Sequence, residues 1–79
     1  MRVIKEINLT NIIIDNHPIN YQTLKLVDFI RNDGEIPAIQ VQNLNNGTYK
    51  IRDGRHRITA YKLLGYKKIK CKYYEKNRN

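Results

Sequence analysis

The dipeptide Asp53-Gly54 constrains the fold more than any other part of this sequence, because a strand pattern ends before it and a helix pattern begins directly after it. Residues 48–52 alternate between apolar and basic side chains, which is typical of a strand with one buried face. Residues 55–64 repeat apolar positions at helical spacing, and Gly65 predicts the end of that helix. A strand that passes so abruptly into a helix requires a residue with unusual backbone freedom, and Gly54 supplies it.

The hairpin before this turn and the strand after the helix complete a sheet. Residues 37–42 predict a strand, and Asn45-Asn46-Gly47 predicts the tight turn that leads back into residues 48–52. Residues 67–74 predict a last strand, in which odd-numbered apolar residues face inward and even-numbered lysines face outward.

The N-terminal half contains two further strand patterns and one helix. Residues 2–7 and 10–14 predict strands, and Asp15-Asn16-His17-Pro18 predicts a turn. Residues 20–32 predict a helix that begins at Asn20 as its N-cap residue.

In that first helix, Leu24, Val27 and Ile30 share the face that we expect to be buried. Gly34 suits a left-handed position at its C-terminal end. The order β-β-α-β-β-α-β predicts an α+β fold, a small mixed sheet with two to three helices packed against it.

The 79 residues are enough for one domain, 1–79, with a polar tail from Glu75 that we expect to fray. Cys71 is the only cysteine, so no internal disulfide forms, and we expect a reducing cytoplasm. With His17 and His56 it also supplies too few soft ligands for a structural zinc site, so no metal site is expected. No apolar run is long enough to span a membrane, and no signal peptide is expected.

The positive charge is concentrated in the C-terminal part. Residues 1–48 contain four basic and five acidic side chains, whereas residues 49–79 contain eleven basic and two acidic ones. A one-sided basic surface attracts polyanions such as nucleic acid, although an AT-rich genome or solubility would also favour lysine. The residues expected to contact nucleic acid are Lys50, Arg52, Lys68, Lys70 and Lys72.

Three basic residues follow the Asp53-Gly54 turn, where a helix normally favours acidic ones. The first N–H groups of a helix and its dipole attract anions, and Arg55 and Arg57 offer donors that match phosphate oxygens. His56 can donate a hydrogen bond or act as an acid or base near neutral pH. The alternative is that the arginines are only solvated and His56 is packed. Asp53 either caps the helix, which we favour, or orients His56 or Arg57.

The sequence resembles the ParB/sulfiredoxin superfamily in three segments, which are residues 34–41 (Gly-Glu-Ile-Pro-Ala-Ile-Gln-Val), 49–65 (Tyr-Lys-Ile-Arg-Asp-Gly-Arg-His-Arg-Ile-Thr-Ala-Tyr-Lys-Leu-Leu-Gly) and 69–73 (Ile-Lys-Cys-Lys-Tyr). Residues 34–73 carry the resemblance. It implies a nucleotide site in which Gly54, His56 and Arg57 hold phosphates, as the equivalent turn holds CTP in ParB proteins and ATP in sulfiredoxins. It also implies that a glutamate such as Glu35 approaches the site as a catalytic group, unless that residue is simply exposed in a loop.

Arg55 departs from both branches of the superfamily, since it stands where a sulfiredoxin has its catalytic cysteine and where a ParB protein has glutamate. Sulfinate reduction is therefore not expected at this turn, and Cys71 is expected to lie in the core instead. The loss of the glutamate weakens the inference of CTP and Mg²⁺, so a nucleoside triphosphate with Mg²⁺ is a cofactor that the resemblance suggests without identifying the base.

Two functions follow from these features. The first is a ParB-like module that binds nucleotide or nucleic-acid phosphates at residues 53–57, associates with DNA, and hydrolyses nucleotide or nucleic acid with His56 as a catalytic group. The second is a non-enzymatic inhibitor or accessory protein of a phage or mobile element that binds a host protein or its nucleic-acid site. The small size of the chain is the main support for the second function.

Overall fold

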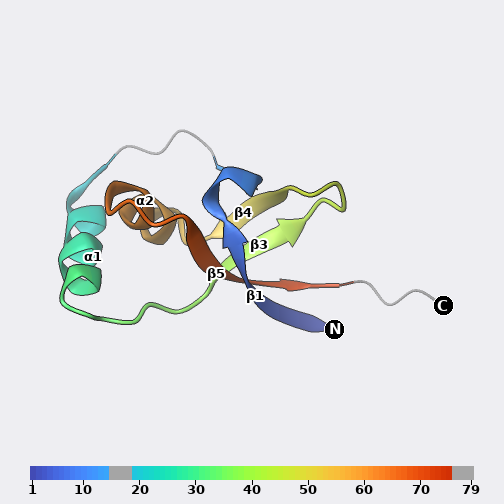
Figure 1. Cartoon of the computed structure of the whole chain (residues 1–79), viewed down its shortest axis with the longest axis horizontal. Coiled ribbons are helices and arrows are strands. Elements are labelled where there is room, and N and C mark those ends of the chain that lie inside the picture. Colours follow the sequence, from blue (N-terminus) through green and yellow to red (C-terminus); the bar gives the residue numbers. More distant parts are fainter. Residues whose placement is uncertain (15–18, 76–79) are drawn as a thin grey trace.

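The computed structural model describes residues 1–14 and 19–75, which form a five-stranded sheet and two α-helices (Figure 1). In chain order the elements are β1 (Arg2–Asn8), the 3₁₀ helix η1 (Leu9–Asn11), β2 (Ile12–Ile13), α1 (Tyr21–Arg31), β3 (Ile39–Asn43), β4 (Tyr49–Asp53), α2 (Arg55–Leu63) and β5 (Lys68–Tyr74). The predicted α+β class and the order of strands and helices are confirmed. The predicted turn at 15–18 lies outside the described residues.

The sheet is mixed, with the strand order β1-β5-β3-β4-β2. β5 pairs antiparallel with β1 and parallel with β3, while β3 and β4 form the predicted hairpin. In the turn of that hairpin, Asn45 and Gly47 have φ values of 62° and 88°, as expected of residues that tolerate a left-handed backbone. β2 pairs parallel with the outer side of β4.

The main core lies between one face of the sheet and α2. Ile39, Ile58 and Cys71 are fully buried there, and Ile69 is 1% exposed. A second cluster joins Val27 of α1 to Ala60 of α2, so the two helices pack on each other as well. Both helices lie toward one end of the sheet, and the β3–β4 hairpin projects at the other end (Figure 1).

The strand predicted over residues 10–14 is wrong over most of its length. Leu9 is buried, and its N–H donates to the carbonyl of Lys67 at 2.9 Å, which draws the chain into the 3₁₀ turn η1. Only Ile12 and Ile13 remain for pairing with β4.

Helix α1 begins after its predicted N-cap, but its buried face differs from the prediction. The side chain of Asn20 accepts a hydrogen bond from the N–H of Thr23 at 3.2 Å. Val27 and Ile30 of the predicted face are buried as expected, but Thr23 is fully buried in place of Leu24, which is 53% exposed. A polar residue can occupy the buried position because the Thr23 hydroxyl is hydrogen-bonded.

The left-handed position after α1 comes one residue earlier than predicted. Asp33, with φ 66°, takes the left-handed position, and its N–H donates to Ile30 while that of Gly34 donates to Phe29. A side chain at Gly34 would place its Cβ 2.5 Å from the Phe29 ring, so close approach explains this glycine.

The ends of the sheet show two smaller differences. β3 begins at Ile39, two residues later than the pattern predicts. The prediction that the tail frays from Glu75 is wrong for Glu75 itself. Its N–H donates to the Met1 carbonyl at 2.8 Å, and its carbonyl accepts from the Met1 ammonium at 3.0 Å. Residues 76–79 of the predicted tail lie outside the described part.

Candidate functional site

The turn between β4 and α2 depends on Gly54. Its φ of 112° lies in the left-handed region, and it is the N-cap residue of α2. A Cβ on Gly54 would stand 2.6 Å from Cγ2 of the fully buried Ile39. The predicted sharp turn is confirmed, and the missing side chain also makes room for Ile39.

The first turn of α2 has the polarity that binds anions. Its first i→i−4 hydrogen bond runs from the N–H of Ile58 to the carbonyl of Gly54 at 2.9 Å. The N–H groups of residues 55–57 come before this ladder, at the positive end of the helix dipole. The backbone would therefore stabilise a negative group that lies against this helix start.

A hollow of about 680 Å³, here called the turn pocket, opens beside this helix start. It is bounded by the turn itself, one side of α1 and the loop that precedes β3. The residues that line it are Gln22, Lys25, Leu26, Ile36, Pro37, Asp53, Gly54, Arg55, His56 and Arg57. All five residues predicted for phosphate binding, Asp53 to Arg57, thus lie on one pocket.

Arg57 is fixed by three hydrogen bonds. Its Nη1 donates to the carbonyls of Pro37 and Ala38, both at 3.2 Å, and its Nη2 donates to Oδ2 of Asp53 at 3.3 Å. The side chain is 21% exposed. Arg57 therefore ties the loop before β3 to α2, and it holds its guanidinium at the pocket in a defined orientation.

Asp53 does not cap α2, contrary to the favoured expectation. Because Gly54 is the N-cap residue, Asp53 lies one position too early and ends β4 instead. Its carboxylate accepts from Arg57, so the second expectation, that it orients an arginine, is the one observed. The Asp53 side chain is 72% exposed, and such a pair contributes less than about 1 kcal/mol to stability.

His56 is held by a residue that the sequence analysis missed. Nδ1 of His56 and the Thr23 hydroxyl oxygen lie 3.2 Å apart, and the histidine tautomer decides which of them donates. Thr23 is fully buried and belongs to α1, so this hydrogen bond joins the two helices at the pocket. Thr23 and Leu24 both lie at helical spacing from Val27 and Ile30, so the periodicity alone does not identify Thr23 as the buried residue.

Lys25 and Gln22 were also missed, and both come from α1. The Lys25 Nζ lies 5.0 Å from the centre of the Tyr21 ring. Because Thr23 is on the buried face of α1, residues 22, 25 and 26 lie on the side of α1 that borders the β4–α2 turn. Lys25 adds a cation to the two arginines at this pocket.

Glu35 does not line the turn pocket, although its neighbours Ile36 and Pro37 do. It is exposed. Burial raises the pKa of Tyr61 above its ordinary value, and Tyr66, Glu6 and Glu35 raise it further by smaller amounts. A catalytic role for Glu35 stays a prediction.

Cys71 lies in the core, as expected. It is fully buried on β5, and its Sγ donates to the carbonyl of Ile69 at 3.4 Å. Burial raises the pKa of the thiol to about 11, so at neutral pH it is not a thiolate nucleophile. Among the described residues, no three histidine, cysteine or acidic side chains cluster as metal ligands, and none of the described helices is long and apolar enough to cross a membrane.

The five basic residues predicted to contact nucleic acid lie on a different surface. They alternate with buried residues along β4 and β5, so they emerge on the face of the sheet opposite α2. The residues are Lys50, Arg52, Lys68, Lys70 and Lys72.

Comparison with solved structures supports the fold. Sulfiredoxin from Arabidopsis thaliana matches with a TM-score of 0.79 at 29% identity, over 94% of this chain and 86% of that one. SbnI with C-terminal truncation from Staphylococcus aureus matches with a TM-score of 0.79 at 27% identity, over 92% of this chain but 31% of that one. The C-terminally truncated chromosome-partitioning protein ParB from Caulobacter crescentus, complexed with CTP-gamma-S, matches with a TM-score of 0.73 at 20% identity, over 95% and 46%.

The family comparison covers almost the whole chain. A search of curated proteins found no match. The family model of the ParB N-terminal domain matches residues 2–78. This extent, together with the shared fold, shows that the chain belongs to the ParB N-terminal domain family.

Proposed function

We propose that this domain binds the phosphate groups of a nucleotide in the turn pocket. One observation supports this proposal most. The N-terminus of α2 and the side chains of Lys25, Arg55, His56 and Arg57 all border the same pocket of about 680 Å³. The helix N-terminus and the basic side chains there are both positive, which suits an anion. The exposed part of the hollow would leave room for a sugar and base beyond the phosphates.

The side chains that line the pocket divide into two groups by how firmly they are held. Arg57 and His56 are held by the loop before β3 and by Thr23, so they would meet a phosphate without first losing conformational freedom. Lys25 reaches the pocket from α1 as an exposed side chain, and it would add charge with less geometric precision. Arg55 lies on the first turn of α2 itself.

The likeness to ParB supports a nucleotide over a simple anion. The solved ParB structure is a complex with CTP-gamma-S, and its fold extends over nearly all of this chain. Asp53 is the only carboxylate among the described residues that line the pocket, so it is the candidate contact for Mg²⁺ that arrives bound to a triphosphate. We confine the proposal to binding, because no second carboxylate from the described part of the chain joins Asp53 there. A cytoplasmic location remains an expectation from the cysteine count alone.

Calorimetric titration of Arg55→Ala and Lys62→Ala beside the wild type tests the proposal. Both variants remove one positive charge from α2, but Lys62 is exposed and does not line the pocket. We expect the affinity for Mg²⁺-nucleotide or pyrophosphate to fall at least about tenfold in Arg55→Ala, since a charge-assisted hydrogen bond contributes about 1.5 to 3 kcal/mol. Equal affinities for the two variants would place the anion elsewhere.

A further inference from the structure

The face of the sheet opposite the helices is uncovered over the described residues. Neighbouring strands bring their outward side chains into register there, with Lys70 beside Glu6, Lys72 between Ile4 and Gln40, and Lys50 beside Gln42. This surface, here called the open face, includes six cations, which are Arg2, Lys50, Arg52, Lys68, Lys70 and Lys72. Glu6 on β1 and Glu75 at one end are the acidic residues beside them. The face therefore has a strong positive excess.

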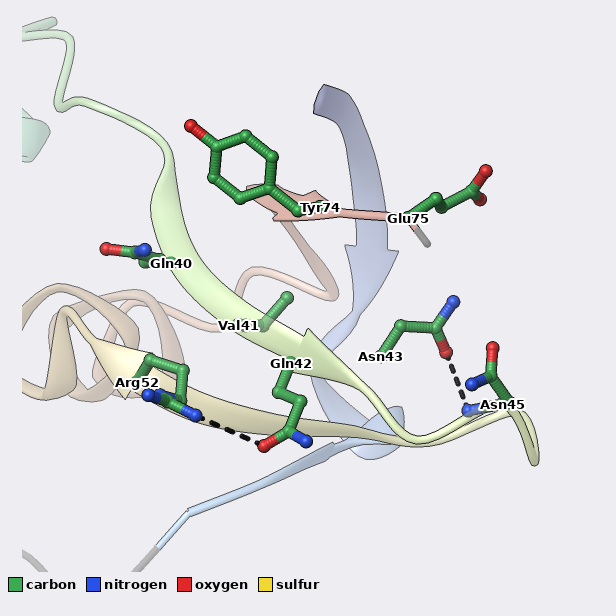
Figure 2. Close-up of a pocket in the computed structure, with 8 residues that line it drawn as sticks. All are labelled: Gln40, Val41, Gln42, Asn43, Asn45, Arg52, Tyr74 and Glu75. Carbon is green, nitrogen blue, oxygen red and sulfur yellow. Dashed lines mark hydrogen bonds between the residues drawn. The ribbon is translucent and has the colours of Figure 1, made fainter. Parts of the chain in front are cut away.

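A groove divides the open face. β3 and β5 pair at only two positions, Ile39 with Cys71 and Gln40 with Lys72, and then they separate (Figure 2). The hollow between them, here called the sheet groove, has a volume of about 670 Å³. The side chains that line it and matter for recognition are Gln40, Gln42, Asn43, Asn45, Arg52 and Tyr74.

The chemistry of the groove differs from that of a simple basic patch. Four amide side chains line it, and amides combine donors with an acceptor, which is the pattern that base edges present. The oxygens of Gln42 and Asn43 already accept from Arg52 and from the Asn45 N–H, which fixes the orientation of these two amides. Arg52 is held beside them by a hydrogen bond from Nη1 to Oε1 of Gln42 at 3.3 Å (Figure 2). The Tyr74 ring is 70% exposed at the rim, which costs free energy in water and offers a surface for stacking.

The arrangement of the cations favours an extended polyanion. Lys68, Lys70 and Lys72 follow one another on the same side of β5, roughly 6.6 Å apart along the strand. This row leads into the groove, because Lys72 pairs with Gln40 where β3 and β5 separate, and Lys70 and Lys68 lie progressively farther from that point along β5. A strand whose phosphates lie on the lysines would therefore continue into the groove, where its next bases would meet Tyr74 and the amides. In a duplex the bases are paired and stacked inside, so their faces would not reach the tyrosine.

From these features we propose that the sheet groove and its lysine row bind single-stranded nucleic acid, with a base stacked on Tyr74 and base edges bonded by Gln40 and Gln42. The proposal does not rest on the nucleotide function of the turn pocket, which is lined by other residues. It specifies single-stranded nucleic acid as the partner of the five basic residues expected to contact nucleic acid. It also adds Arg2, Tyr74 and the amide side chains to that contact surface.

Fluorescence anisotropy with labelled single strands of about 12 nucleotides, as DNA and as RNA, and with a duplex of equal length tests this proposal. Tyr74→Ala should weaken single-strand binding about five- to hundredfold, because stacking on an aromatic ring contributes about 1 to 3 kcal/mol per base. Tyr21→Ala is the matched control, since Tyr21 is 71% exposed but lies on α1, and it should leave binding unchanged. Gln42→Ala tests the amide contacts in the same way.

The lysine row is tested by salt. Lys70→Ala should lower the slope of log affinity against log salt by about 0.7, while Lys62→Ala on α2 should not change it. Excess Mg²⁺-nucleotide should leave the oligonucleotide bound, and a nucleotide that displaces it would show one shared site and overturn the proposal. Equal binding of duplex, equal affinities for Tyr74→Ala and Tyr21→Ala, or binding of acidic peptides without any binding of oligonucleotides would each overturn it as well.

Discussion

The turn pocket and the sheet groove have nearly equal volumes, about 680 and 670 Å³, but they are built in different ways. Five consecutive residues, Asp53 to Arg57, form half of the turn pocket's lining, and the dipole of a helix points at it. The groove takes its residues from separate strands and contains no helix end. One hollow is thus suited to a compact anion, and the other to an extended chain.

Neighbouring residues of β3 and β4 face different hollows, as Arg52 of the sheet groove and Asp53 of the turn pocket show. Ile39 faces the helices, where it fills the space next to Gly54, while Gln40 faces outward into the groove. Alternation along β3 therefore allows the two surfaces to be changed independently.

The largest expected effect is that of Gly54→Ala. The added Cβ would meet Ile39 at 2.6 Å on a backbone with φ 112°, so we expect a loss of about 2 to 4 kcal/mol in the free energy of unfolding. Gly65→Ala is the control, because φ is 83° there but the space is open, and it should cost about 1 kcal/mol. Urea denaturation measures both, and equal losses would show that Ile39 does not brace the turn.

Arg57→Ala comes next, because it removes hydrogen bonds as well as a charge at the turn pocket. We expect nucleotide binding to be lost and the free energy of unfolding to fall by about 1 to 3 kcal/mol, since the carbonyls of Pro37 and Ala38 lose their donor. Arg57→Lys should recover part of the stability but little of the binding. Calorimetry and urea denaturation separate the two effects, and a variant that binds nucleotide normally would remove Arg57 from the site.

The element order, the hairpin turn and the α2 start follow from the sequence because each has a local cause. Asn45 and Gly47 tolerate a left-handed backbone, and Asn20 caps its helix with its own side chain. The burial of Thr23 in place of Leu24 has a distant cause. It depends on a hydrogen bond to His56, 33 residues away, which no periodicity in the helix reveals.

The same distinction explains the errors at the site. The five residues of the turn are contiguous, so one motif identified them together. Lys25 and Gln22 belong to α1, which is distant from the turn in the sequence, and only the packing of α1 on α2 brings them to the pocket. The groove is set by the separation of β3 from β5 after two pairs, and no pattern within either strand predicts where two strands separate.

A smaller effect is expected from Thr23→Val, which keeps the shape of the side chain but removes its hydroxyl. His56 loses its partner on α1, so the free energy of unfolding should fall by about 1 kcal/mol and nucleotide affinity by less than about tenfold. Thr10→Val, at an exposed threonine in η1, is the control and should change neither. If the two variants behave alike, Thr23 does not position His56.

The smallest expected effect is that of the Cys71 thiol, which pairs with Ile39 in the sheet and changes stability only above neutral pH. Its thiol should resist alkylation in the folded domain and react once urea unfolds it. Since burial raises its pKa from 9.0 to about 11, only the unfolded chain loses this proton over that interval, and stability should fall as the pH rises through it. Cys71→Ala should show a shallower fall in the urea midpoint, and an identical fall would assign the effect to tyrosines.

The most direct test of the central claim is a backbone amide NMR titration of the wild-type domain with Mg²⁺ complexes of CTP, ATP and GTP. We predict that at least one nucleotide shifts the resonances of residues 53–57 and Lys25 in a saturable way, while Gln40, Gln42 and Tyr74 in the groove stay unchanged. No saturable shift at residues 53–57 with any of the three nucleotides at millimolar concentration, or shifts confined to the groove, would contradict the assignment of the turn pocket as the nucleotide site.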